Sequence, residues 1–206
     1  SPIMHRMKSS ASSLTLIAVL TAVSLGINTL AYISYYTVDK MTEQSMPADF
    51  IVINGKEEAF ANALDDANIV YDKVVYNYLE VAADLSGLLK NKNDVNNIGY
   101  DVYGMSRVIP ASSVEERLQG NEAIVANFNN YTTQLFEFEV NQSIMVGYSV
   151  PLNVTKLDHN SILLGGYGIK LHPVIIVSDE MFKTLNSMTD VVYPKTEVQV
   201  NLQKHS

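Results

Sequence analysis

The feature that most constrains this chain is a run of thirty residues without a charged side chain, between Lys8 and Asp39. Within it, residues 14–36 read LTLIAVLTAVSLGINTLAYISYY, and the polar members are Thr, Ser, Asn and the tyrosines near its end. As a helix this stretch would be about 34 Å long, enough to cross a hydrocarbon core of roughly 30 Å. A helix also satisfies its own backbone hydrogen bonds, which lipid requires. The run therefore predicts a membrane-spanning helix over residues 13–36.

The charges on either side of the run predict its orientation. Arg6 and Lys8 precede it, and Asp39 is the first charge after it. Because basic residues favour the cytoplasmic side, residues 1–12 are expected in the cytoplasm and residues 37–206 outside the cell. The tyrosines that close the run would then lie at the outer membrane interface, where a ring with a hydroxyl group is stable.

Two other interpretations of the run are weighed against a spanning helix. A cleaved signal peptide usually has an apolar region of only about 7–15 residues, and Thr29-Leu30-Ala31 is a poor cleavage site. A buried core helix is the other alternative, but so long an uncharged stretch exceeds the usual length. The chain also begins Ser1-Pro2-Ile3 instead of with Met. We therefore expect a fragment of a longer protein or a cloning remnant.

The rest of the chain is strongly acidic. Residues 37–206 hold all 22 acidic residues but only 12 of the 14 basic ones, a balance of −10. Such a domain repels nucleic-acid phosphates, so we expect no nucleic-acid partner. The absence of cysteine excludes a disulfide scaffold, a thiol nucleophile and a thiolate metal site.

The pattern of apolar residues beyond the run predicts an α+β domain. Alternating or β-branched segments indicate strands, and apolar residues spaced three or four apart indicate helices. A short helix followed by a polar loop is a further expectation for residues 81–97. The predicted strands are 51–53, 69–79 (one or two strands), 108–110, 136–140, 144–150, 174–177 and 198–202, and the predicted helices are 56–67, 112–119 and 178–187.

Three local signals support particular elements. Ser112 with Glu115 three residues later forms a capping box, so a helix is predicted there with its end at Gly120. Ser178 precedes Asp179 and Glu180, which favours a second capped helix. The dipeptide Asn141-Gln142 separates two alternating runs, which predicts a hairpin with one buried face.

The sequence contains no set of residues that fits a known kind of catalytic site. The four histidines are scattered at positions 5, 159, 172 and 205, and no nucleophile, phosphate-loop or zinc-protease motif is present. Asp65, Asp66 and Asp72 lack the spacing of a calcium loop and are interpreted as a solvated face. The glycine cluster at 165–168 is interpreted as a turn. We therefore expect no enzyme activity, no cofactor and no metal.

The remaining signal is the combination of carboxylates and tyrosines. An acidic surface with amphipathic rings suits a cationic amphiphile, because the charges attract it and the rings cover its apolar side. The alternative is a set of core tyrosines beneath a soluble negative shell. The same pattern continues through Glu80, Asp84, Tyr100, Asp101 and Tyr103. The residues that we predict to bind a ligand are Asp65, Asp66, Tyr71, Asp72, Tyr76 and Tyr78.

The order of these features resembles a known family. The helix at 9–36 is followed by Pro47-x-Asp49-Phe50, then by an amphipathic helix and by the strand-to-helix step VIIVSDEMFKTL at 174–185. This succession is similar to the FtsX-like permeases of ABC transporters, in particular the BceB-like permeases of bacitracin and lantibiotic resistance in Gram-positive bacteria. The resemblance implies that the helix is the seventh of ten and leads into one large extracellular domain.

The resemblance also implies partners. It implies a cytoplasmic ATPase subunit, a membrane sensor histidine kinase, and as ligand a cationic antimicrobial peptide or a lipid-linked cell-wall precursor. It assigns no catalytic residue, because hydrolysis would belong to the ATPase. The alternatives are a singly anchored extracellular binding or sensor protein without a transport role, and a membrane-tethered hydrolase.

Overall fold

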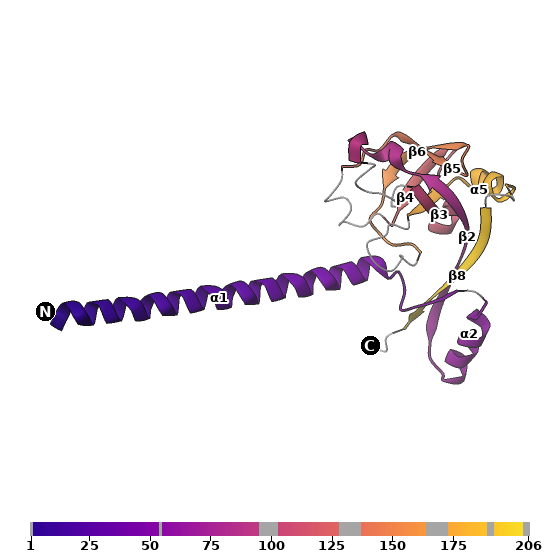
Figure 1. The fold of residues 1–206 in the computed structure, drawn as a ribbon. Coiled ribbons are helices and arrows are strands. Elements are labelled where there is room, and N and C mark those ends of the chain that lie inside the picture. Colours follow the sequence, from indigo (N-terminus) through magenta and orange to yellow (C-terminus); the bar gives the residue numbers. More distant parts are fainter. Residues whose placement is uncertain are drawn as a thin grey trace. The chain divides into compact units, whose positions relative to one another are not determined.

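A computed structural model describes residues 2–53, 55–94, 103–127, 137–163, 173–188 and 192–203. The chain divides into two compact units, Ser1–Glu43 and Gln44–Ser206. The first is helical, and the second holds a mixed sheet with helices (Figure 1). The predicted α+β class, an apolar helix followed by a mixed α/β-sheet domain, is confirmed.

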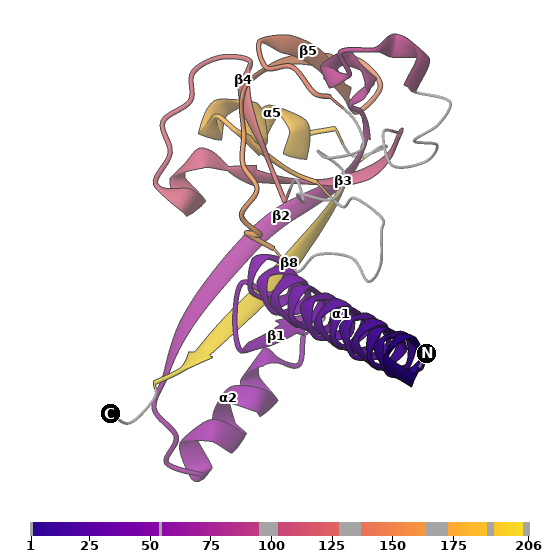
Figure 2. The same ribbon diagram turned by 90° about the vertical axis from the view of Figure 1, so that its left-hand side faces the viewer.

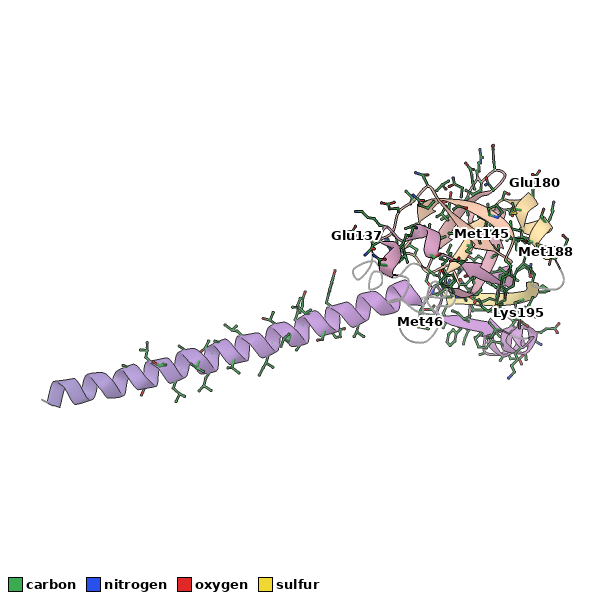
Figure 3. The ribbon with its side chains drawn as sticks, turned by 45° about the horizontal axis from the view of Figure 1, so that its top comes forward. Met46, Glu137, Met145, Glu180, Met188 and Lys195 are labelled. Carbon is green, nitrogen blue, oxygen red and sulfur yellow. The ribbon has the colours of Figure 1, made fainter. Side chains whose placement is uncertain are left out.

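The first element is α1 (Pro2–Ser45), which extends beyond both ends of the predicted span. Its segment Ser13–Tyr36 is long and apolar enough to cross a membrane, with a mean hydropathy of 2.0, and none of it is buried within the structure. Figure 3 shows its side chains projecting on all sides of the helix. Three threonine hydroxyls donate to the carbonyl oxygen four residues earlier, at 2.8–2.9 Å, so their polar hydrogens have partners without water: Thr15, Thr21 and Thr29.

The second unit contains eight strands and two α-helices in the part of the chain that is described. The strands are β1 (Phe50–Ile53), β2 (Tyr71–Asp84), β3 (Tyr103–Pro110), β4 (Glu122–Ala126), β5 (Gln142–Val146), β6 (Val150–Leu157), β7 (Val174–Val177) and β8 (Val192–Leu202). The helices are α2 (Glu57–Asp66) and α5 (Asp179–Asn186), with short 3₁₀ turns at η1 (Ser86–Leu88), η2 (Lys92–Asp94) and η4 (Ala111–Val114).

The strands form one sheet in the order β1-β8-β2-β3-β7-β4-β6-β5, and β5 also pairs with β2. This last pairing, Ala83 with Val146 and Asp84 with Met145, closes the six strands from β2 to β5 into a ring. Strand β2 is long enough to belong both to the ring and to the part of the sheet that extends from it. Its last residues belong to the ring, whereas its first residues pair only with β8 and extend away from it (Figure 2).

The main hydrophobic core lies inside the ring. Because side chains alternate across a strand, the odd-numbered residues Leu79, Val81 and Ala83 of β2 point to one face, and all three are buried in this core. Leu185 of α5 is fully buried in the same cluster, and Met181 and Phe182 pack against it. Strand β7 is buried along its whole length, as expected for a central strand flanked by β3 and β4.

Helix α2 covers the part of the sheet that extends from the ring, which we call the arm (β1, α2, and the paired segments 71–78 and 195–202). Leu64 of α2 packs against Val198 and Val200 of β8, and Phe60 lies 5.5 Å from the Phe50 ring. The helix ends at Asn68, whose φ of +54° is left-handed and whose N–H donates to the Asp65 carbonyl oxygen. The helix predicted at 56–67 is thus confirmed.

The capping box predicted at Ser112 is wrong. The segment Ala111–Val114 is a 3₁₀ turn without a side-chain cap, and Glu115 adopts a left-handed φ of +57° that stops it. The Ser112 backbone N–H donates to Asp179 Oδ1 instead, so this segment is held by the start of α5. The local capping signal therefore does not produce a helix here.

The predicted hairpin about Asn141-Gln142 is also wrong. Strand β5 pairs with β6 through a turn at Gly147, Tyr148 and Ser149, and Phe138 lies in an isolated bridge with Leu89 instead of a strand that pairs with β5. Residues 81–84, expected in a helix, continue β2. Strands β4 and β6 were missed. Residues 95–102, 131–136, 164–172 and 204–206, which include the glycine cluster, lie outside the described residues.

Ser178 and Ser112 provide a matched test of helix capping. Ser178 Oγ accepts from the Met181 N–H at 3.2 Å and donates to the Gly120 carbonyl oxygen at 3.0 Å, whereas the side chain of Ser112 caps no helix. We expect Ser178→Ala to lower the free energy of unfolding by about 1–2 kcal/mol and Ser112→Ala to lower it by less than about 0.5 kcal/mol. Urea denaturation of residues 44–206, followed by circular dichroism, measures both, and equal losses would contradict the assigned cap.

Candidate functional site

The six residues predicted to bind a ligand lie on two faces of the arm. Along β2, Tyr71 points to the face that α2 covers, whereas Asp72, Tyr76 and Tyr78 point to the opposite face, because residue parity alternates. Asp65 and Asp66 are exposed at the end of α2. The structure therefore brings these residues together in two groups, and one contiguous surface does not contain all six.

On the α2 face, Asp65 lies beside Tyr71. Partial burial, then the charge of Asp65 and a hydrogen bond to its carboxylate, raise the pKa of the Tyr71 hydroxyl. The phenol of Tyr71 is neutral at physiological pH, as a tyrosine usually is. On the other face, Asp72 lies at the start of β2. Gln203 Nε2 donates to its carboxylate oxygens at 3.3 and 3.4 Å.

Tyr76 and Tyr78 belong to a buried polar cluster where the arm meets the ring. Among its charged members are Arg107 of β3 and Glu197 of β8, whose Nη1 and Oε2 atoms lie 3.9 Å apart, and Glu80 lies directly opposite Arg107 on β2. Glu197 is 1% exposed. Gln199 Nε2 donates to Glu197 Oε1 at 3.0 Å and to the Ile162 carbonyl oxygen at 2.6 Å. Strands β2, β3 and β8 and the segment before residue 164 therefore meet in this cluster.

The cluster shifts the ionisation of its members. Burial, and then Glu197, raise the pKa of Tyr76. Burial, and then Glu80, raise the pKa of Tyr78, although Arg107 opposes them. Burial lowers the pKa of Arg107 while Glu197 opposes that effect. Because the phenols stay neutral and the charges are paired, the cluster supports the junction rather than offering a reactive group.

A pocket of about 490 Å³ lies at the other end of β2, on the outside of the ring. It is lined by Ala82, Ala83, Asp84, Tyr103, Gly104, Met145 and Tyr148. Register explains this grouping. Asp84 is directly opposite Tyr103 on β3 and opposite Met145 on β5, so the carboxylate lies between a ring and a thioether. Figure 3 labels Met145 in this part of the sheet.

The sequence indicated part of this pocket and missed the rest. Asp84 and Tyr103 were in the predicted acidic and aromatic pattern. Tyr148 was expected on a buried hairpin face, but it is 78% exposed in the β5–β6 turn, with a left-handed φ of +66°. Met145 was not singled out. The glycine at 147 was the available signal, because a glycine before Tyr148 favours a turn there.

No metal site is formed by the described residues, in which no group of three or more His, Asp or Glu side chains is placed to hold an ion. A second pocket, of about 600 Å³, lies where the loop after β3 meets the start of α5, between Glu116, Arg117, Asp179 and Glu180. Its charges of both signs give it no strong preference for one kind of ligand.

The buried pair allows a test of its structural role. Glu197→Gln removes a buried carboxylate that is paired with Arg107, and Glu80, directly opposite Arg107 on β2, remains. We expect the free energy of unfolding to fall by about 2–4 kcal/mol. Lys90 and Glu137 form the exposed counterpart, with Nζ and Oε2 2.6 Å apart, and Glu137→Gln is expected to cost less than about 1 kcal/mol. Denaturant unfolding of residues 44–206 measures both variants. Similar losses would show that burial of the Glu197 charge is not important to the junction.

Comparison with known proteins relates the whole chain to permeases. It is 30% identical over 214 aligned residues to the bacitracin export permease protein BceB of Halalkalibacterium halodurans, which covers all of this chain and 32% of that protein. It is 29% identical over 199 residues to the BceB protein of Bacillus subtilis, covering 92% of this chain and 30% of that protein. No family model matches the chain.

The chain thus spans about a third of the length of the curated relatives it matches. The predicted resemblance to BceB-like permeases of ABC transporters is confirmed. Both relatives are named as permeases, in agreement with the prediction that this chain is not an enzyme. The candidate membrane helix and the permease relatives together support a membrane location.

Proposed function

We propose that this chain is the ligand-recognising part of an ABC transporter permease that confers resistance to antimicrobial peptides. The observation that carries the proposal is the similarity to bacitracin export permeases, which extends through both the apolar helix and the α+β unit. In this proposal α1 spans the membrane, residues 1–12 are cytoplasmic and residues from about 37 onward are extracellular. A cytoplasmic ATPase subunit and a membrane sensor histidine kinase are its proposed partners.

The acidic α+β unit is proposed to bind or sense a peptide antibiotic or its lipid-linked target. The unit, residues 44–206, holds 20 acidic and 11 basic residues, a balance of −9 that favours a cationic ligand, because long-range attraction raises the ligand concentration near the surface. Transport itself would come from ATP-driven motion of membrane helices, and ligand binding would shift the equilibrium between conformations. The six residues predicted from the sequence remain candidate contacts in this proposal, as two separate groups.

The proposed orientation is testable because the chain has no cysteine. Single-cysteine variants Lys8→Cys and Glu58→Cys, on the two sides of the candidate span, are treated in intact cells with a membrane-impermeant maleimide. We expect Glu58→Cys to be labelled at once and Lys8→Cys only after the membrane is permeabilised. The cysteine-free chain is the control, and labelling of Lys8→Cys in intact cells would overturn the orientation.

Peptide recognition is tested with the 206-residue chain in nanodiscs of zwitterionic lipid. We expect a cationic antimicrobial peptide to bind, with an affinity about tenfold weaker at 0.5 M than at 0.05 M salt, because screening shortens the range of the attraction. Calorimetric titration gives the dissociation constant, and empty nanodiscs are the control. Absence of binding at low salt by folded protein would exclude direct peptide capture and leave the lipid-linked target as the ligand.

A further inference from the structure

The pocket beside Asp84 has features that the proposed function does not yet use. We propose that it holds one ammonium or guanidinium group of a cationic amphipathic peptide, together with the apolar side chain beside it. This inference rests on the proposed peptide recognition and names its site. The residues that carry it are Asp84, Tyr103, Met145 and Tyr148.

The pocket is chemically selective for a cation. Asp84 is its single charged lining residue, and no described lysine or arginine is among the residues that line it. Asp84 is half-buried, and its Oδ1 accepts from the Ser86 N–H at 2.8 Å, which fixes the direction of the carboxylate. A half-buried carboxylate attracts a cation more strongly than one in open water, because the surrounding dielectric is lower.

The walls of the pocket suit the apolar part of the same ligand. Tyr103 and Met145 are 46% and 36% exposed, although they lie on paired strands directly beside Asp84. Aromatic faces attract cations, and a thioether adapts its shape to irregular apolar groups. A lysine beside a leucine therefore finds a carboxylate, two rings and a flexible apolar side chain within one pocket.

Tyr148 is placed at the rim at a conformational cost. Its φ of +66° is one that glycine adopts readily and that a tyrosine adopts at some expense in free energy. The Gly147 N–H donates to the Ala82 carbonyl oxygen at 2.8 Å, which holds this turn against β2. The residue is largely exposed and so contributes little to packing. The successive left-handed residues Gly147 and Tyr148 are those of a tight hairpin turn between β5 and β6, and this turn presents an exposed tyrosine beside the pocket.

The experiment uses the full chain in zwitterionic nanodiscs and a short peptide of alternating lysine and leucine. We expect Asp84→Asn to weaken binding about tenfold and Tyr148→Gly about three- to tenfold. Tyr148→Phe, which keeps the ring, should bind within about twofold of the parent. Tyr148→Gly should also unfold at the same or a higher temperature, whereas a tyrosine needed for folding would lower it.

Glu58→Gln is the control for net charge. It removes one negative charge from the first turn of α2, where the neighbouring Glu57 lines a pocket with Val75 of β2. Val75 is roughly 30 Å along the strand from Asp84. We expect it to change affinity by less than about twofold at 0.15 M salt. Equal weakening by Asp84→Asn and Glu58→Gln would show that diffuse charge attracts the peptide and would overturn the pocket.

Methionine methyl resonances locate the peptide independently. In the chain labelled with ¹³C-methyl methionine, we expect the Met145 signal to shift on titration, while Met188, which packs against the core beside α5, stays in place. An unmoved Met145 signal during peptide binding would overturn the pocket and leave the proposed function standing.

No peptide binding by any variant would reject both this site and direct peptide capture. A glutamine-leucine peptide that binds equally well would overturn selection by charge.

Discussion

The hydrogen bonding of β2 is the constraint on which the rest of the α+β unit depends. This strand pairs with β8 along Tyr71–Val81, with β3 along Leu79–Asp84 and with β5 at its last two residues. Because one backbone supplies three ladders, the ring and the arm are parts of the same sheet. The alternation of its side chains then sends one set into the ring core and under α2, and the other set to the outer face.

The outer face of this sheet carries different kinds of side chain along its length. At the arm it carries Asp72, at the junction the buried pair of Arg107 and Glu197, and beyond the junction the pocket of Asp84 and Tyr103. The paired charges are enclosed and fixed, whereas the pocket is open to solvent. The proposed recognition role therefore belongs to the open end of the face, and the junction holds the arm in a defined place relative to the ring.

The sequence predicted the elements whose signals are local. The apolar run, the α2 pattern, the buried run of β7 and the Ser178 cap all depend on nearby residues, and all appear in the structure. Ser112 has an equally good capping pattern but lies in a 3₁₀ turn that ends at Glu115 with a left-handed φ of +57°, and its backbone N–H binds Asp179 from a distant segment. Strand β4 escaped prediction since its partners β6 and β7 lie far along the chain, and its parallel pairing with β6 leaves no turn to mark it. Strand β6 was missed because the hairpin turn was predicted at Asn141-Gln142, whereas it lies between Val146 and Val150.

The sequence predicted which residue types the site contains but not where they lie in the fold. Carboxylates and tyrosines near β2 were evident, yet strand parity divides Asp65 and Tyr71 from Tyr76 and Tyr78. The pocket at Asp84 exists because β5 returns to β2, which no spacing in the sequence indicates.

The closure of the ring at Ala83 and Asp84 has a mechanical consequence. Moving β2 by one residue would turn its buried leucine and valine side chains to solvent and its acidic ones inward, so the strands cannot slide past one another. A ligand bound where β2 pairs with β5 could therefore change the position of the arm only by tilting or twisting the sheet as a whole. The continuous backbone of β2 would then transmit this movement from the pocket to the arm, and the arm would rotate about a point near the Arg107 and Glu197 pair.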